Sequence, residues 1–379
     1  MKQEILEANG EYSVLDAWFL ANNIHRAMLV CGRSIERLSI HAYLEKLPER
    51  LGVQIIRFQD FQPNPLYANV VDGVKRFREQ ECDALIAVGG GSAMDVAKCI
   101  KLFSNMPREG KEGCFLRQTV CANTIPFLAM PTTSGTGSES TRFAVIYYQG
   151  NRQSVSDVSC IPQTVLMDSS VLKTLPLYQK KATMMDALCH AIESFWSVNS
   201  TEESKQYSRD AIRQILLHKD DYLANIDAGN AGMLYAANLA GKAINITQTT
   251  AGHAMCYKIT SLFGCAHGHS AILCDRILYS HLVKHTANCA DPRGKTYLEQ
   301  TLNEIADAMG CENALQGAQK LSELFRQSGL QIPEARAEQF EQLKTSVNPV
   351  RLKNHPVALD LNEIDVLYHQ ILRETKNEG

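Results

Sequence analysis

One aspartate and three histidines in the second half of the chain have the types and spacing of a divalent-metal site. Asp186 and His190 lie four positions apart in "MMDALCHAIESFW", so on a helix both side chains would share one face. His253 and His267 lie fourteen positions apart in "GHAMCYKITSLFGCAH". One carboxylate and three imidazoles suit Fe²⁺ or Zn²⁺ and leave a coordination position for a substrate. For the first two residues the alternative is a simple Asp–His pair on the surface.

The neighbours of these four residues leave choices open. His269 follows His267 by two positions, and spacing alone does not decide between them. Gly268 favours a turn, which would let the chain fold back so that both imidazoles reach the face of Asp186. Glu193 also lies near that face, where we expect it to support the site or the fold.

A glycine-rich segment precedes these residues in "ALIAVGGGSAMDVAKCIKLF". An apolar strand is followed by three glycines and then a helix, whose exposed N–H groups and dipole favour phosphate. The alternative, a tight turn with a capping box between Ser92 and Asp95, is compatible with phosphate binding. The pattern is not G-x-G-x-x-G, so an ordinary dinucleotide fold is not indicated.

A second segment rich in hydroxyl groups is "AMPTTSGTGSESTRFAVI". Its hydroxyl loop, residues 132–138, follows a predicted parallel strand, where ligands of open α/β sheets bind. We therefore expect it to contact a ligand, although such loops are often only connections.

The elements that must position these residues change character along the chain. Apolar runs alternate with amphipathic segments such as 66–80, which predicts a parallel sheet covered by helices. The predicted strands are 27–31, 53–58, 84–88, 126–130, 142–148 and 164–168. After "LKTLP" the period is near 3.6 residues. We expect an α/β domain over residues 1–176 and an all-helical domain over 177–379.

Composition narrows the class of protein. The chain has 379 residues, 45% of them apolar, and a net charge of −3. This composition supports large cores and makes nucleic acid an unexpected partner. No signal peptide and no membrane span are expected. The twelve cysteines form no C-x-x-C pair and are expected to be reduced thiols of a cytoplasmic protein.

Four motifs in order, "VGGGSAMDVAK", "PTTSGTGSE", "DALCHAIE" and "GHAM…AHGHS", resemble those of the iron-containing (group III) alcohol dehydrogenases. The resemblance spans roughly 27–275 and implies a Rossmann-like dinucleotide-binding domain, a helical domain and a homodimer. It implies the metal ligands Asp186, His190, His253 and His267, because the fourteen-residue gap favours His267 over His269. It also implies the cofactor-binding residues Gly89, Gly90, Gly91, Ser92, Asp95, Thr132, Thr133 and Ser138.

The chain departs from the family pattern at two places. Tyr257 stands where many members have a second histidine that is thought to relay a proton. Tyr257 could replace it, or the relay could run through water or the ribose. NAD-preferring members often have an acidic residue after the first strand, whereas Gly32, which we also expect to bind the cofactor, is followed here by Arg33 and Ser34. Because no carboxylate stands at this position to repel the 2′-phosphate of NADPH, we hypothesise that NADPH is accepted and preferred over NADH.

Cations near the expected site suggest a substrate class. "HAMCYKITSLFG…HGH" and "NPVRL-x-N-x-P" resemble the branch of the family that includes phosphonoacetaldehyde reductases. A phosphonate dianion needs cationic partners, for which Arg142, Lys258 and Arg351 are candidates. The alternative for each of the three is solvated surface charge.

The implied reaction is reversible hydride transfer between a primary alcohol or aldehyde and NAD(P), with the metal as Lewis acid. The substrate could be phosphonoacetaldehyde. The alternative is a general short-chain alcohol dehydrogenase of the propanol, butanol or diol type. Less favoured are a dehydroquinate synthase-like lyase, which shares a related fold, and a ligand-binding protein that has lost its metal.

Overall fold

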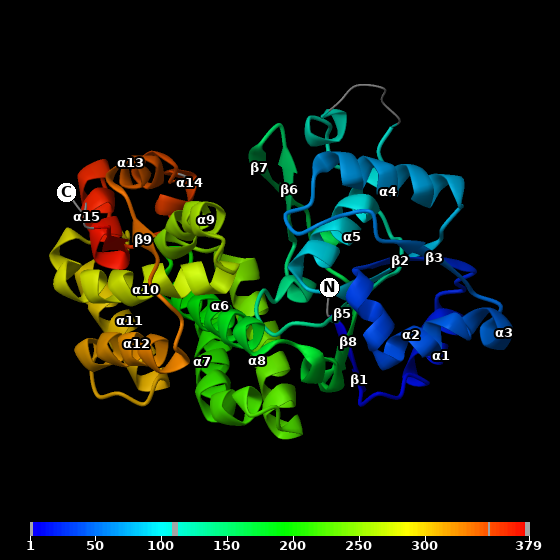
Figure 1. The fold of residues 1–379 in the computed structure, drawn as a ribbon, viewed down its shortest axis with the longest axis horizontal. Coiled ribbons are helices and arrows are strands. Elements are labelled where there is room, and N and C mark those ends of the chain that lie inside the picture. Colours follow the sequence, from blue (N-terminus) through cyan, green and yellow to red (C-terminus); the bar gives the residue numbers. More distant parts are fainter. Residues whose placement is uncertain (1–2, 108–112, 348, 376–379) are drawn as a thin grey trace. The chain divides into compact units, whose positions relative to one another are not determined.

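The computed structural model describes residues 3–107, 113–347 and 349–375, which form two compact units (Figure 1). The first unit comprises the chain up to Thr133 together with Gly137–Leu175. The second comprises Ser134–Thr136 and the chain from Pro176 onward.

The first unit contains a six-stranded sheet in the order β1-β8-β5-β4-β2-β3, and every pairing is parallel. The strands are β1 (Glu4–Ala8), β2 (Arg26–Cys31), β3 (Gln54–Phe58), β4 (Ala84–Gly89), β5 (Phe127–Pro131) and β8 (Thr164–Asp168). β4 and β5 are buried along their whole length, as apolar runs covered on both faces should be. The predicted parallel sheet is confirmed.

Helices cover this sheet and position the glycine-rich segment. They are α1 (Val14–Ala21), α2 (Ser39–Glu45), α3 (Leu47–Leu51), α4 (Tyr67–Glu79) and α5 (Gly91–Ser104). α4 and α5 pack together, and their buried Val74, Ile100 and Phe103 join Val30 and Leu85 of the sheet in one apolar core. Because α5 begins directly after β4, its N-terminus lies at the carboxyl end of that strand.

Two strand predictions need correction. The run 142–148 does form a strand, β6 (Phe143–Tyr148), but it pairs antiparallel with β7 (Asn151–Ser156) in a separate hairpin. β1 was not predicted. It is an edge strand with the sequence EILEA and mostly exposed side chains, so it lacks the apolar run of a central strand.

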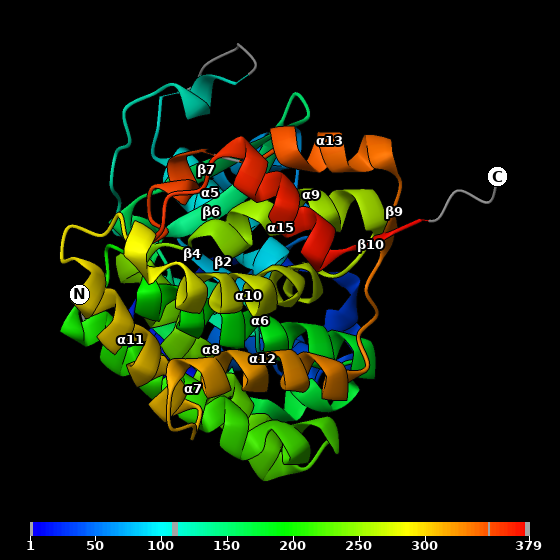
Figure 2. The ribbon, with the colours of Figure 1, turned by 90° about the vertical axis from the view of Figure 1, so that its left-hand side faces the viewer.

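The second unit is helical apart from two short paired strands, β9 (Glu334–Ala335) and β10 (Arg373–Glu374). Its helices are α6 (Leu177–Trp196), α7 (Glu202–Leu223), α8 (Asp227–Thr247), α9 (Ala251–Phe263), α10 (His267–Lys284), α11 (Lys295–Ala308), α12 (Ala314–Ser328), α13 (Ala337–Thr345), α14 (Pro349–Leu352) and α15 (Leu361–Ile371). α6 packs against α7, α8 and α10 (Figure 2). Within the described residues, no helix is long and apolar enough to cross a membrane.

Candidate active site

α6 supplies two of the predicted metal ligands from the centre of the second unit. Asp186 and His190 are both buried, and their four-residue spacing places them on one helix face. The alternative of a surface pair is therefore excluded. Glu193 follows within the next turn of α6 and is fully buried.

The other two candidates lie at the beginnings of consecutive helices. His253 is in the first turn of α9, and His267 is the first residue of α10. The chain turns at Gly264, whose φ of 67° ends α9, so the predicted turn at Gly268 is wrong. Gly268 instead permits a close approach: a Cβ there would lie 2.1 Å from the Ala182 carbonyl oxygen. The missing side chain therefore lets α10 approach α6.

Three of the four side chains converge. Asp186 Oδ1 lies 3.6 Å from His253 Nε2 and 3.9 Å from His267 Nε2. The His190 ring stacks on that of His253, with ring centroids 4.4 Å apart. His190 Nδ1 lies 3.4 Å from the carbonyl oxygen of Gly135, which would fix this ring and leave Nε2 available as a ligand atom.

Two atoms at the centre of this cluster have no hydrogen-bond partner although they are buried: Asp186 Oδ1 and His253 Nε2. Buried polar atoms are rarely left unpaired, and a cation between a carboxylate oxygen and imidazole nitrogens would satisfy both. The donor set suits Fe²⁺ or Zn²⁺. The residues therefore fit a divalent metal.

The pKa shifts of Asp186 and His190 support the same assignment, whereas burial lowers the pKa of His253 but Glu193 and Asp186 outweigh it and raise that pKa well above its ordinary value, so a metal would displace the proton of this imidazole. Burial raises the pKa of Asp186, but His190, His267 and His253 outweigh it and hold that pKa below its ordinary value. Burial lowers the pKa of His190 to about 4, so its imidazole is neutral near pH 7. A charged carboxylate and a neutral imidazole are the forms that bind metal.

Glu193 accepts four hydrogen bonds, two from Thr250 and two from His253, and so anchors the first turn of α9. Its Oε2 accepts from the backbone N and the hydroxyl of Thr250, the latter at 2.6 Å, and its Oε1 accepts from the backbone N of His253 at 3.0 Å. Oε1 also lies against His253 Nδ1. With Nδ1 bound to a carboxylate, Nε2 is directed to the metal position. The sequence placed Glu193 near this face but did not indicate its partners.

The structure distinguishes His267 from His269, the alternative candidate for the fourth metal ligand. His269 is buried, with Nδ1 3.2 Å from the Tyr178 hydroxyl and Nε2 2.8 Å from the carbonyl oxygen of Gln331. Both ring nitrogens are therefore already engaged. Tyr257 stacks on His267, with ring centroids 5.5 Å apart and an interplanar angle of 19°. The phenol is thus beside a candidate ligand.

In the first unit the glycine-rich turn contacts Thr132 and Thr133, the beginning of the hydroxyl loop. The backbone N of Thr132 donates to the carbonyl oxygen of Gly89 at 3.0 Å. A Cβ on Gly90 would lie 3.2 Å from Thr133 Oγ1, so glycine lets these segments approach. Both lie at the carboxyl ends of neighbouring strands, β4 and β5, as a ligand site of an open sheet requires.

Two of the predicted cofactor-binding residues, Asp95 and Ser138, have partners within the first unit. α5 begins at Gly91 with Gly90 as its N-cap, so Ser92 lies within the first turn and the predicted capping box with Asp95 does not form. Asp95 instead accepts hydrogen bonds from the Ser138 side chain and the Val145 backbone. Ser138 is itself buried. Asp95 and Ser138 are therefore committed to contacts within the first unit.

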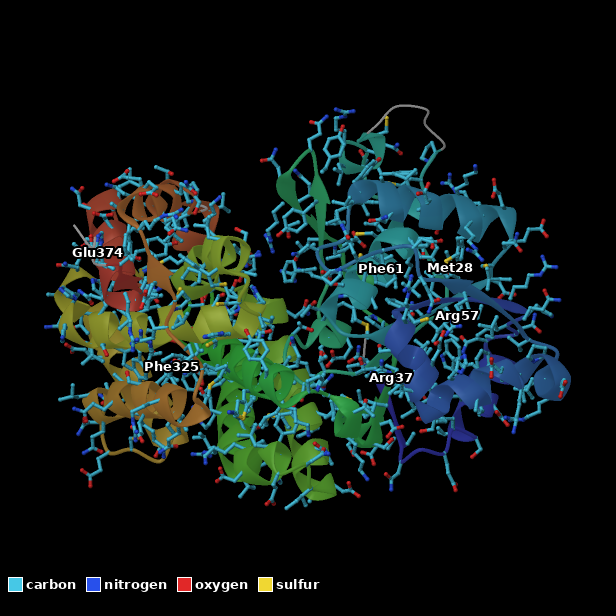
Figure 3. All side chains as sticks on the ribbon, in the orientation of Figure 1. Met28, Arg37, Arg57, Phe61, Phe325 and Glu374 are labelled. Carbon is cyan, nitrogen blue, oxygen red and sulfur yellow. The ribbon has the colours of Figure 1, made fainter. Side chains whose placement is uncertain are left out.

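The cations near the two segments differ in their surroundings. After β2, Arg33 and Arg37 are exposed (Arg37 and Arg57 are labelled in Figure 3). Arg57 of β3 has buried Nε and Nη2 atoms without hydrogen-bond partners, and its Nη2 lies 3.6 Å from Glu36 Oε1 in an ion pair. In the second unit, Arg351 Nη1 donates to the hydroxyl of Thr249. The remaining substrate candidates, Arg142 and Lys258, are half-buried.

Comparisons with known proteins cover both units. The model of "Iron-containing alcohol dehydrogenase" matches residues 3–169, and that of "Fe-containing alcohol dehydrogenase family, C-terminal" matches 180–372. Alcohol dehydrogenase 4 of Saccharomyces cerevisiae is 31% identical over 290 residues, covering 74% of this chain and 72% of the relative. Phosphonoacetaldehyde reductase of Streptomyces viridochromogenes is 30% identical over 251 residues, 62% of each chain.

Solved structures give the same fold. Sulfoacetaldehyde reductase from Bifidobacterium kashiwanohense, solved with NAD⁺, has a TM-score of 0.84 at 23% identity and covers 97% of this chain and 96% of that one. A 1,3-propanediol oxidoreductase has a TM-score of 0.85 at 23% identity and covers 97% and 98%. The predicted class, an enzyme that interconverts an alcohol and an aldehyde, is confirmed, and the chain belongs to the iron-containing alcohol dehydrogenase family.

Proposed function

We propose that the chain reduces a small aldehyde with a nicotinamide cofactor at an Fe²⁺ site formed by Asp186, His190, His253 and His267, with Zn²⁺ as the alternative metal. The observation that supports this most directly is the unpartnered pair of buried atoms, Asp186 Oδ1 and His253 Nε2. A bound Fe²⁺ supplies Lewis acidity that polarises the carbonyl group and stabilises the alkoxide.

The chain's own residues provide the rest of the chemistry. The N–H groups at the start of α5 and the hydroxyls of Thr132 and Thr133 hold the cofactor phosphates and ribose. Glu193 keeps His253 in one orientation. Tyr257, stacked beside His267, is the candidate for passing a proton to the product alcohol. Cytoplasmic location and a homodimer, implied by the family resemblance, belong to the same proposal.

For the substrate we propose an anionic aldehyde of the phosphonoacetaldehyde type. Lys258 follows Tyr257 on α9, and Arg351 is held at Thr249, just before the segment that contacts Glu193. Both cations therefore adjoin segments that build the metal cluster. The similarity to a named phosphonoacetaldehyde reductase supports the same substrate class.

We expect protein reconstituted anaerobically with Fe²⁺ to prefer phosphonoacetaldehyde over propionaldehyde, lactaldehyde and succinic semialdehyde when NAD(P)H oxidation is followed. Lys258→Ala should raise KM for phosphonoacetaldehyde about tenfold, because a charge-assisted contact is lost, and should leave propionaldehyde kinetics unchanged. Lys284→Ala, at the C-terminal end of α10, is the control. Similar rates on charged and uncharged aldehydes would favour the general alcohol dehydrogenase instead.

We also propose that NADPH is preferred over NADH, since Arg33 and Arg37 follow β2 directly and Arg57 lies on the neighbouring β3. Gly32 has a φ of −84°, and a Cβ there would meet only Ser34 Oγ, at 3.9 Å, so a larger residue fits. Gly32→Asp should lower kcat/KM for NADPH relative to NADH at least about tenfold, because its carboxylate repels a 2′-phosphate. Gly32→Asn is the uncharged control. A wild-type enzyme with a strong NADH preference would contradict the proposal.

A further inference from the structure

The hydroxyl group of Thr250 is buried behind the metal cluster and has three side-chain partners. It lies 2.6 Å from Glu193 Oε2, and the indole Nε1 of Trp196 donates to it at 2.9 Å. His355 Nδ1 is the third partner, at 3.4 Å. A hydroxyl group has one proton to donate, and an ionised carboxylate can only accept. The proton of Thr250 therefore goes to Glu193, and the indole and the imidazole both donate to the hydroxyl oxygen.

The imidazole of His355 has the protonation that this contact requires. The side chain is buried, and burial outweighs the attraction of Glu193 and lowers the pKa of His355 to about 3. The ring is therefore neutral near pH 7 and carries one proton. With that proton on Nδ1, the other nitrogen, Nε2, is an acceptor, and within the described residues it has no hydrogen-bond partner. The bond to Thr250 is thus the one that the surrounding fold provides for.

The backbone is fixed on both sides of His355. The carbonyl oxygen of Asn354 accepts from the backbone N of Val198 at 3.0 Å. The carbonyl oxygen of Pro356 accepts from the backbone N of Ala290 at 2.8 Å. These two bonds hold the C-terminal segment against the end of α6 and against the loop after α10. The imidazole therefore reaches the threonine from a defined position.

The junction between α8 and α9, which carries Thr250, needs contacts from outside. Gln248 at this junction has a φ of 60° and a ψ of 175°, a backbone conformation that is unfavourable for residues other than glycine. Asn354 holds the next residue, because its Nδ2 donates to the carbonyl oxygen of Thr249 at 3.1 Å. Two consecutive residues of the C-terminal segment, Asn354 and His355, thus contact two consecutive residues of the junction.

The contacts continue from the junction to a metal ligand. Glu193 accepts from the hydroxyl of Thr250 and lies against His253 Nδ1, so that Nε2 of His253 is directed to the metal position. A carboxylate behind a metal-binding imidazole sets the orientation of the ring and the affinity for the metal. The orientation of the Thr250 hydroxyl therefore bears on metal affinity, although Thr250 is not a ligand.

We propose that His355, with Asn354 beside it, is a positioning residue of the metal site. It fixes the Thr250 hydroxyl in the direction of Glu193, and through Glu193 it fixes the imidazole of His253. The inference rests on the proposed binding of Fe²⁺ by the aspartate and the three histidines. It gives the C-terminal segment a role in metal binding that is separate from contact with a substrate.

The test compares His355→Leu with His355→Asn in the full-length protein. Both substitutions remove the imidazole ring and introduce side chains of nearly the same shape, but only asparagine has an Nδ2 donor that can replace Nδ1. Fe²⁺ affinity is measured by competition with a chelator, and the absorption spectrum of the Co²⁺-loaded protein reports the geometry of the ligands. The unfolding midpoint of each metal-free protein is the third measurement.

We expect His355→Leu to weaken Fe²⁺ binding about fivefold and to shift the Co²⁺ absorption bands. His355→Asn should stay within about twofold of the wild-type affinity and keep the wild-type spectrum. The metal-free asparagine variant should be no more stable than the leucine variant, because its amide leaves polar atoms unpaired in a buried place. Equal Fe²⁺ affinity in the two variants, at the wild-type level or below it, would overturn the inference.

Asn354→Leu provides a second variant in case the His355 variants do not fold. It keeps the side-chain shape but removes the donor to the Thr249 carbonyl oxygen, and about a threefold loss of Fe²⁺ affinity is expected. Adding Gln248→Gly should restore most of that affinity, because glycine adopts the backbone conformation of the junction without strain. An unchanged affinity in Asn354→Leu would overturn the inference. A wild-type protein that binds neither Fe²⁺ nor Co²⁺ would overturn the proposed function, and this inference with it.

Discussion

Replacing His267 with alanine is expected to remove the bound iron and to lower kcat/KM at least about 10³-fold, because the Lewis acid is lost with its ligand. Replacing His269 with alanine should leave iron and most of the activity in place. The reason is geometric: His267 Nε2 faces Asp186 Oδ1 at 3.9 Å, whereas both nitrogens of His269 have partners in Tyr178 and Gln331.

The two variants form a matched pair, since both truncate an imidazole within the first turn of α10. Iron content after anaerobic reconstitution and gel filtration is the primary measurement, and the unfolding midpoint of the metal-free proteins is the second. His269→Ala should lower that midpoint more, because it removes a more deeply buried side chain and its two hydrogen bonds. Iron retained by His267→Ala but lost from His269→Ala would transfer the ligand role to His269.

Most of the fold could be predicted because its central strands are apolar runs with clear boundaries. The runs at 27–31, 84–88 and 126–130 correspond to β2, β4 and β5. β1 was missed because an edge strand is covered on fewer sides and does not need such a run. β6 was placed in the wrong sheet, since strand character does not show which partner a strand pairs with.

In the candidate site, too, contacts within one helix could be predicted from the sequence, whereas contacts between distant residues could not. Spacing along one helix was enough to bring Asp186 and His190 together. The four donors around Glu193 come from Thr250 and His253, nearly sixty residues away. No sequence pattern near Glu193 predicts these contacts.

Glu193→Gln is expected to reduce iron affinity by about 10- to 100-fold, the usual cost of removing the carboxylate behind a metal-binding histidine. Burial raises the pKa of Glu193, but His253 and Thr250 outweigh it and hold that pKa at about 2, so the group is charged near pH 7. Its charge makes Nε2 of His253 a better electron donor. An amide keeps the shape but loses this charge. Competition with a chelator would measure the affinity without reference to turnover.

Asp275→Asn is the matched control, because Asp275 is an equally buried carboxyl group beside Glu193. A Cβ on Gly252 would lie 1.8 Å from its Oδ1, so the group packs directly against the first turn of α9. Burial and the neighbouring charge of Glu193 raise the pKa of Asp275 well above its ordinary value. Because an amide keeps the shape of this side chain, Asp275→Asn should leave iron affinity within about threefold. If both substitutions weakened iron binding equally, the effect would not be specific to the charge of Glu193 behind His253.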